Sequence, residues 1–367
     1  MKLIHCADLH LDSKLSGNLD KIQAKERKSE ILHTFERMVQ YAVQHDISAI
    51  LIAGDMFDTK NISATTRNVV LSNIKNHPEI CFYYLRGNHD NDNFLSEVDA
   101  IPENLKMFGE QWTSYAIGNI VITGIELTPE NAGSAYVSLV LDHKKFNIVM
   151  LHGQEAESSY SNAKDKAETI PLKTLRNRGI DYLALGHIHA YKKEALDARG
   201  TVCYVGCLEG RGFDECGDHG FVVLDIEEDT NTYTHKFVPF AARKLYTIPV
   251  DVSGALTTAE MSERVTAALQ SWGCEREDLV KIVLTGILDV ECEKDVEYMV
   301  SKFCSQYYFV KIYDETSLKL EIADYLLDES LKGEFVRMVM KDAKLLEEDK
   351  TSIIRYGLQA IAGEEIL

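Results

Sequence analysis

The stretch Ala49–Asp58, AILIAGDMFD, decides the fold. Its apolar first half is typical of a strand that is buried on both faces of a sheet. Gly54 lets the backbone turn sharply where the strand ends, so Asp55 is left at the carboxyl edge, where open α/β sheets bind their ligands. Asp55 and the second carboxylate at Asp58 suit a divalent cation, although an aspartate after a strand can equally cap a turn or a helix.

The composition indicates an ordinary soluble globular protein of 367 residues, of which 45% are hydrophobic and 26% charged. No apolar run approaches the roughly 20 residues that span a bilayer, and MKLIHCADLH becomes polar too early for a signal peptide. Eight cysteines without a CxxC pair favour a reduced, cytoplasmic protein. The formal net charge of −19 is unusual for a DNA-binding protein, but it bears on solubility and on the long-range field rather than on a site.

Residues 1–243 alternate strands with helices, which predicts a largely parallel sheet. Strands are expected at 2–6, 49–53 and 80–85, and helices at 19–44 and 63–76, the second with Ser63 as its N-cap. Further along, strands are expected at 114–117, 120–124, 147–151, 182–185, 201–205, 220–226 and 233–238, with a helix near 171–178. We therefore expect an α/β fold in which two sheets pack face to face with helices outside.

Residues 244–327 are expected to form a small α+β domain, and residues 328–367 a helical tail. The small domain should contain strands at 246–250, 280–285, 309–313 and 318–322, and helices at 257–272 and 294–304. In the tail, the spacing places Leu331, Phe335 and Met338 on one helix face, and Ile354, Leu358 and Ile361 on another. Such amphipathic helices could pack on their own domain or dock a partner.

Polar side chains that suit a transition metal follow directly after the predicted strands: Asp8, His10, Asp55, Asn88, His89, His152, His187 and His189. They should project from one edge of the sheets. Histidine and carboxylate together suit Mn²⁺, Fe²⁺ or Zn²⁺ better than Ca²⁺ or Mg²⁺ alone. There are too many candidates for one ion with open positions, so two ions are expected. A single motif would be weak evidence, but the ordered set D-x-H, G-D-x-x-D, G-N-H-D, H-G and G-H-x-H is specific.

This ordered set resembles the calcineurin-like metallophosphoesterases over residues 1–240. Within that superfamily, HCADLHLD, GDMFD and GNHD are similar to the SbcD-type DNA repair nucleases. The segment Gly206–Gly220 and the tail IIRYGLQAIAG are similar to their YhaO-like branch. The resemblance implies the two-sheet metallophosphoesterase sandwich, two divalent ions per chain, and a capping domain at 245–325.

Carried over motif by motif, the resemblance implies one ion held by Asp8, His10, Asp55 and His189, and another held by Asp55, Asn88, His152 and His187. Asp55 would bridge the two. His89 would protonate or stabilise the leaving 3′-oxygen, with Asp90 holding its ring, and the alternative is a structural histidine. Asp58 is left open between support of the site and a turn. Mn²⁺ is the favoured ion, and Fe²⁺, Zn²⁺ and Mg²⁺ are alternatives.

Five cations close to the motifs are candidates for binding the phosphates of DNA: Lys14, Arg86, Lys192, Lys193 and Arg211. An arginine can bind phosphate through two parallel hydrogen bonds, and a bound metal pair would add local positive charge. For Arg86, a solvated arginine is an equal alternative.

The resemblance implies a Mn-dependent nuclease that cuts double-stranded DNA ends in double-strand break repair, with internal nicking as an extension. Its partners would be DNA and an SMC-like ATPase of the SbcC type, and a homodimer is left open. One alternative is a phosphatase or cyclic-nucleotide phosphodiesterase of the same superfamily, although GDMFDTK lacks the arginine of the GDxVDRG pattern seen in protein phosphatases. A non-catalytic DNA-end scaffold is the other.

Overall fold

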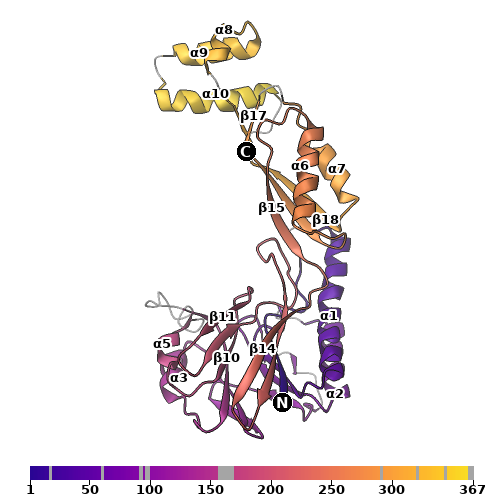
Figure 1. Cartoon of the computed structure of the whole chain (residues 1–367), viewed down its shortest axis with the longest axis vertical. Helices are drawn as coiled ribbons and strands as arrows, with labels where there is room; N and C mark the ends of the chain where they lie inside the picture. Colours follow the sequence, from indigo (N-terminus) through magenta and orange to yellow (C-terminus); the bar gives the residue numbers. More distant parts are fainter. Residues whose placement is uncertain are drawn as a thin grey trace. The chain divides into compact units, whose positions relative to one another are not determined.

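The computed structural model describes residues 1–15, 19–58, 62–90, 94–95, 100–155, 169–289, 292–319, 322–342 and 345–362. The chain divides into two compact units, Met1–Lys244 and Leu245–Leu367, which are drawn in one view in Figure 1 and are described separately below. Within the described ranges, no helix has the length and apolarity that a membrane crossing requires.

The first sheet of the N-terminal unit has the strand order β14-β13-β1-β2-β3-β4. Its parallel part consists of β1 (Lys2–Cys6), β2 (Ala49–Ala53), β3 (Cys81–Leu85) and β4 (Leu105–Met107). Two antiparallel strands, β13 (Gly220–Glu227) and β14 (Thr232–Pro239), complete it. Every residue of β2 is buried, as its apolar run predicts.

The second sheet has the order β11-β12-β10-β7-β6-β5. Its parallel part consists of β6 (Ile120–Gly124), β7 (Phe146–His152), β10 (Tyr182–Gly186) and β12 (Thr201–Tyr204). The antiparallel edge strands are β5 (Thr113–Ile117) and β11 (Lys192–Ala195). A separate short ladder joins β8 (Gln154–Glu155) to β9 (Thr169–Ile170).

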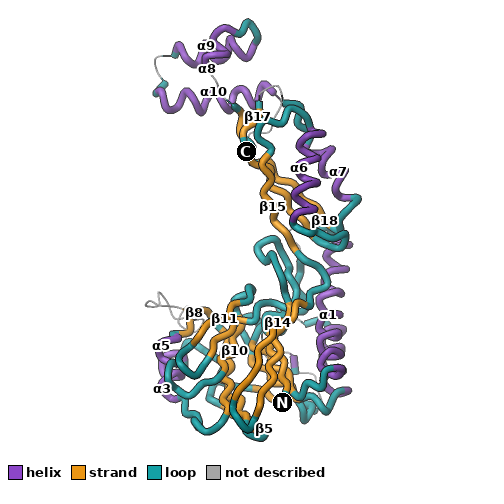
Figure 2. The backbone as a smooth tube through the Cα atoms, in the orientation of Figure 1, coloured by secondary structure: helices purple, strands orange, loops and turns teal. Residues whose placement is uncertain are grey.

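The two sheets pack face to face around a buried apolar layer to which Leu51, Met150 and Ala184 belong. Helices α1 (Lys21–Gln44) and α2 (Ala64–Asn76) cover the outer face of the first sheet. Helices α3 (Ala132–Ser138) and α5 (Leu172–Leu175) cover the outer face of the second. The predicted two-sheet sandwich flanked by helices is therefore confirmed, and its orange strands are visible in Figure 2.

Local signals explain where the helices begin and end. The Asp20 side chain accepts hydrogen bonds from the backbone N–H groups of Ile22 and Gln23, which caps α1. Ser63 caps α2, as predicted, by accepting from Thr66. The helix predicted near 171–178 is only one turn long, because Arg176 adopts an extended backbone conformation.

The C-terminal unit contains a three-stranded parallel sheet of β15 (Leu245–Asp251), β16 (Leu279–Thr285) and β18 (Phe309–Asp314). Helices α6 (Thr258–Ser271) and α7 (Val296–Cys304) contribute to its apolar core. A two-residue ladder joins β17 (Ile287–Leu288) to β19 (Ser317–Leu318). The strand predicted at 318–322 overlaps β19 only at Leu318, residues 320 and 321 lie outside the described residues, and a helix, α8 (Ile322–Leu327), begins at the last predicted residue.

The last helices, α9 (Leu331–Lys341) and α10 (Glu347–Ala362), pack with α8 around Val336, Val339, Ile354 and Leu358. Leu331, Phe335 and Met338 share one face of α9, as predicted, and this face lies largely outside the core. Leu331 is 72% exposed and Met338 64% exposed, because α9 turns its Val336 and Val339 side toward the core. The second predicted stripe is buried at Ile354 and Leu358.

Candidate metal centre

The seven predicted ligands lie where parallel strands of the two sheets end. Residues that follow β1, β2 and β3 meet residues at the ends of β7 and β10: Asp8, His10, Asp55, Asn88, His152, His187 and His189. Asp8 and His10 are each 1% exposed, and Asp55 is 2% exposed. The two adjacent sheet edges therefore build one polar centre.

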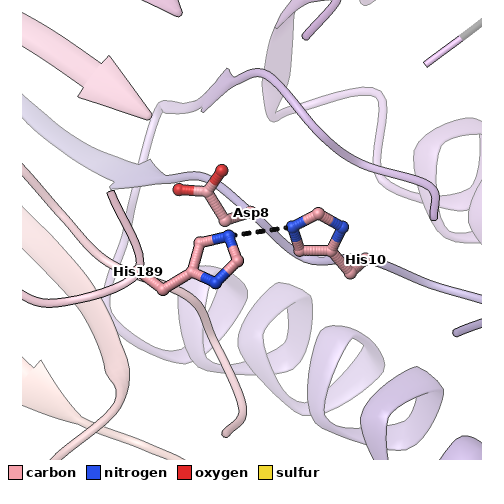
Figure 3. Close-up of side chains that lie close together, drawn as sticks. All are labelled: Asp8, His10 and His189. Carbon is pink, nitrogen blue, oxygen red and sulfur yellow. Dashed lines mark hydrogen bonds between the residues drawn. The ribbon is translucent and has the colours of Figure 1, made fainter. Parts of the chain in front are cut away.

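Asp8, His10 and His189 form the first cluster, and Figure 3 shows the rings of His10 and His189 facing each other with the Asp8 carboxylate close by. The two Nε2 atoms of His10 and His189 lie 3.1 Å apart. One potential ligand atom from each residue lies within 4.8 Å of the others. Two imidazole nitrogens and a carboxylate oxygen that converge in this way are a suitable ligand set for a transition-metal cation.

Asp55, Asn88, His152 and His187 form the second cluster. The Asn88 Oδ1 atom lies 3.0 Å from His152 Nε2 and 3.3 Å from His187 Nδ1. His152 Nδ1 faces the carbonyl oxygen of Ala53 at 2.9 Å and donates to it, so His152 Nε2 is the nitrogen directed into the cluster. The ligand-type atoms of this cluster thus point toward a common space.

Asp55 belongs to both clusters. Its Oδ2 atom lies 3.3 Å from His152 Nε2 and 3.9 Å from His10 Nε2. Its other oxygen, Oδ1, accepts a hydrogen bond of 2.9 Å from the backbone N–H of His89. One carboxylate oxygen therefore lies between the two groups of histidines, which is the position that a bridging ligand requires.

The backbone at the centre is strained. Asp8, His10, Asp55 and His187 all have positive φ angles, which side-chain-bearing residues rarely adopt. Such residues cost on the order of 1–3 kcal/mol each and occur preferentially at functional sites. Gly54 is required here, because a Cβ atom would lie only 2.1 Å from His152 Nδ1.

At the centre, buried carboxylates and histidines shift one another's pKa values. Burial raises the pKa of the Asp55 carboxyl, but the nearby His152 outweighs burial and holds that pKa well below its usual range. Burial lowers the pKa of His152, but Asp55 and Asp8 outweigh it and raise the pKa to about 9. The buried carboxylates therefore require positive charge beside them, and a divalent cation would supply more of it than a proton.

His89 lies at the margin of the centre with its side chain 46% exposed. Its ring makes an edge-to-face contact with His10, with 5.1 Å between the ring centroids. Its Nδ1 atom lies 3.4 Å from the carboxylate of Asp58. The ring is therefore open to a substrate and close to the centre at the same time.

The expectation that Asp90 holds the His89 ring is corrected by the structure. The Asp90 carboxylate instead accepts hydrogen bonds from the backbone N–H groups of Met56, Phe57 and Gly87. Burial raises the pKa of Asp90 to about 6. Asp90 thus joins the loops after β2 and β3, and Asp58 is the carboxylate near the ring.

The open question about Asp58 is also resolved in geometric terms. Its Oδ1 atom lies 3.1 Å from His10 Nδ1 and 3.2 Å from a guanidinium nitrogen of Arg211. The contact with His10 is close but lies outside hydrogen-bond geometry, since His10 Nδ1 is buried without an aligned partner. Asp58 therefore supports the centre electrostatically rather than serving only as a turn residue.

Three of the five candidate DNA-binding cations are already paired with carboxylates. Arg86 donates two hydrogen bonds, of 2.7 and 2.6 Å, to Glu126. Arg211 binds Glu215 and Asp58, and Lys192 lies beside Glu155 and Glu194. The other two, Lys14 and Lys193, are exposed and form no ion pair among the residues that the structure describes.

Glu215 is a residue of the centre that the sequence did not single out. Its Oε1 atom lies 2.6 Å from His189 Nδ1, and its carboxyl group is buried. The residue lies in an irregular segment between β12 and β13, where no periodicity predicts which way a side chain points. The available signals were its place in the YhaO-like segment Gly206–Gly220 and its four-residue spacing from Arg211.

The donor set fits two divalent cations that share one carboxylate. Each cluster supplies histidine nitrogen together with carboxylate or amide oxygen, and Asp55 Oδ2 is within 4 Å of a histidine nitrogen in both. A pair of such cations could contact the oxygens of one phosphate group. The arrangement is thus chemically suited to phosphoester hydrolysis.

The chain matches a known family and is similar to several known proteins. Residues 1–191 match the family described as calcineurin-like phosphoesterase. The chain is 29% identical to the uncharacterised metallophosphoesterase YhaO of Bacillus subtilis, over 64% of this chain and 59% of YhaO, so it spans less than two thirds of that relative. It is 24% identical to the DNA double-strand break repair protein Mre11 of Saccharolobus solfataricus, over 100% of this chain and 97% of that protein. Among solved structures, TT1561 of Thermus thermophilus aligns with a TM-score of 0.41 at 12% identity, over 64% of this chain and 98% of that one.

Proposed function

The chain belongs to the calcineurin-like phosphoesterase family and is a metal-dependent hydrolase of phosphoester bonds. From this premise we propose that it is a manganese-dependent nuclease acting on double-stranded DNA ends. Internal cleavage of DNA is a secondary activity in this proposal. The proposed biological setting is the repair of double-strand breaks.

The observation that carries the proposal is the position of Asp55 Oδ2 between His10 and His152. In the proposal, Asp8, His10 and His189 hold one ion, Asn88, His152 and His187 hold the other, and Asp55 binds both. When bound, two such ions polarise the phosphoryl oxygens and activate a water molecule. Mn²⁺ is favoured, because mixed histidine and carboxylate sets suit it better than they suit Mg²⁺.

His89 is the proposed general acid. Its half-exposed ring lies beside His10, so a scissile phosphate bound at the centre would bring its leaving oxygen near the imidazole. Asp58 orients the ring, and the bond from the His89 backbone to Asp55 fixes the start of the loop. Donation of a proton to the leaving 3′-oxygen is the step assigned to His89.

The preference for DNA over a small phosphate ester rests on the length of the similarity. The alignment with a DNA double-strand break repair protein extends over the whole chain and therefore includes the C-terminal unit. In the proposal, residues 244–327 form a capping domain, and residues 328–367, which contain α9 and α10, dock an SMC-like ATPase of the SbcC type.

We expect DNA binding by this chain alone to be weak. Four phosphate contacts would give a slope of about −3.6 for log K against log salt, at roughly −0.9 per contact. Since only Lys14 and Lys193, of the five candidates, form no ion pair within the described ranges, a slope of about −1.8 is expected instead. Nanomolar binding of duplex DNA by a His89→Gln variant that persists at about 0.2 M salt would contradict this expectation.

A panel of substrates with Mn²⁺ tests the proposed function. The hydrolysis rate should be measured, with and without chelator, on four substrates: linear duplex DNA, circular single-stranded DNA, and p-nitrophenyl phosphate as a monoester and as a diester. Cleavage of linear duplex that exceeds monoester hydrolysis supports the nuclease. Brisk monoester hydrolysis without DNA cleavage in any divalent metal would show a phosphatase instead.

A further inference from the structure

We propose that Glu215, held in place by Arg211, is a positioning residue that directs His189 toward the first metal ion. The inference rests on the two-ion site proposed above but not on the choice of DNA as substrate. It concerns two residues that lie outside the motifs, in the segment between β12 and β13.

The contact between Glu215 and His189 fixes which nitrogen of the ring is available. Glu215 Oε1 lies 2.6 Å from His189 Nδ1, so the carboxylate accepts the Nδ1 proton. The other ring nitrogen, Nε2, is then the one without a proton, and it faces His10 Nε2 at 3.1 Å. A carboxylate behind a ligating histidine in this way sets its tautomer and its orientation and increases its basicity.

Arg211 holds Glu215 through both the backbone and the side chain. Its backbone N–H donates to Glu215 Oε2 at 2.7 Å, and its guanidinium donates to Oε1 at 2.8 Å. The guanidinium also lies 3.3 Å from His189 Nδ1, but both atoms carry protons once Nδ1 donates to Glu215, so the shorter contact with the carboxylate governs. Glu215 is 8% exposed and has little freedom to turn away.

The same guanidinium reaches a second carboxylate of the centre. It lies 3.2 Å from Asp58, which is near both His10 and His89. Arg211 therefore bridges the carboxylate behind His189 and the carboxylate near the proposed general acid. In this role its charge is used inside the protein and not for binding phosphate.

The two clusters differ in how their histidines are held. In the second cluster, His152 donates its Nδ1 proton to a backbone carbonyl, that of Ala53. No side-chain substitution removes that acceptor. The loss of Glu215 should therefore weaken the first ion and spare the second.

The test is Mn²⁺ titration calorimetry of the full chain with Glu215→Ala and Glu215→Gln. We expect Glu215→Ala to weaken one of two Mn²⁺ sites by about 10–100-fold, which is the usual effect of removing such a partner, and to leave the other site unchanged. Glu215→Gln keeps an oxygen that can accept a hydrogen bond from Nδ1. The loss of Mn²⁺ affinity in this variant should therefore lie at the small end of that range. If Glu215→Ala does not fold, Arg211→Ala gives a second test, because it leaves the carboxylate and the backbone N–H at position 211 but removes the guanidinium that holds Oε1.

A readout in the metal-free protein separates positioning from stability. The ¹⁵N chemical shifts of the His189 ring should show the proton on Nδ1 in the native chain and in Glu215→Gln, and a mixture of tautomers in Glu215→Ala. Asp181→Asn is the matched control, because Asp181 is also a buried carboxylate paired with an arginine, Arg199, but lies at the opposite end of β10. Two unchanged Mn²⁺ affinities and an unchanged tautomer in a folded Glu215→Ala chain would overturn the proposal.

Discussion

Two regions of the molecule differ in which kind of side chain they bury. One is the sheet edge with the metal centre, and the other is the group of helices α8–α10. At the sheet edge, carboxylates and histidines are buried and contact one another. On α8–α10, large apolar side chains remain exposed, among them Leu327 at 89% and Leu331 at 72%. Within the described residues, every group of side chains suited to a metal lies in the N-terminal unit.

The difference suggests a division of roles. Burying charged side chains is costly unless they are paired or coordinate a metal, whereas a large exposed apolar surface is typical of a site that meets a partner. Chemistry is thus expected to depend on the first region, and assembly on the second. The experiments below change one region at a time, in order of decreasing expected effect.

Replacing the shared carboxylate should have the largest effect. Asp55→Ala is expected to abolish binding of both ions, because Asp55 Oδ2 lies beside a histidine of each cluster. Turnover should fall by more than about 10⁴-fold, since each ion contributes several kcal/mol. Metal content per chain and the rate in Mn²⁺ measure this, with Asp181→Asn as the control. Two ions retained in Asp55→Ala would remove Asp55 from the bridging position.

Replacing the exposed histidine should slow chemistry without removing the ions. His89→Gln is expected to keep full metal occupancy and to lower turnover by roughly 10²–10⁴-fold, the usual contribution of a general acid. Single-turnover rates on DNA, together with metal analysis, are the measurement. If the rate does not change, His89 has a structural role only.

Changes on the helices should leave catalysis intact and weaken assembly. The double variant Leu331→Ser and Met338→Ser removes two exposed apolar side chains that, if buried by a partner, would contribute about 1.5 kcal/mol each. Affinity for the ATPase should then fall by about 10²-fold, while the melting temperature and the nuclease rate stay constant.

A matched pair on the other unit serves as the control for this experiment. Val137 and Val140 are 73% and 86% exposed, and their replacement by serine should not affect ATPase binding. Equal losses from both double variants, or loss from neither, would argue against docking through α9.

The smallest expected effect concerns His5, a buried residue of β1 that belongs to neither metal cluster. Burial lowers the pKa of His5 to about 3, and the nearby His235 adds to this shift. The unfolded chain takes up the proton near pH 6.5 while the folded chain does not, so stability is lost as the pH falls below 6.5. Between pH 6.5 and 5.5 the loss from His5 alone is about 1 kcal/mol.

Denaturant unfolding at the two pH values, with chelator present, measures this loss. The variant His5→Asn keeps a polar atom near the hydroxyl of Tyr182, which lies 2.9 Å from His5 Nδ1, but it does not titrate. Its stability should fall by about 1 kcal/mol less than that of the native chain over the same interval. Equal losses in the two proteins would show that His5 is protonated in the folded state.

The sequence predicts the sandwich well because its strands are apolar runs with polar residues at their ends. It fails where that pattern is absent. Strand β11 reads KKEA and is exposed at every position, so only its pairing with β12 makes it a strand. Helix α8 and the orientation of α9 also depend on packing, because several faces of these helices carry apolar residues.

At the centre, the order of the motifs predicts which side chains meet but not what holds them. The resemblance implied that Asp90 holds the His89 ring, yet its carboxylate binds backbone groups from two loops. Glu215 contacts His189 across 26 residues, and no local pattern encodes such a contact. Interactions set by tertiary structure were therefore the ones that the sequence did not reveal.

The distance along the chain between His10 and His189 has a consequence for folding. These two residues are 179 positions apart, and their nitrogens meet only when both sheets have formed and packed together. A cation that needs both therefore recognises the native state and has no comparable site in a half-folded chain. The binding free energy of the cation adds to stability by mass action. Because the site forms only after both sheets have packed, the bound cation should mainly slow unfolding and have little effect on the rate of folding.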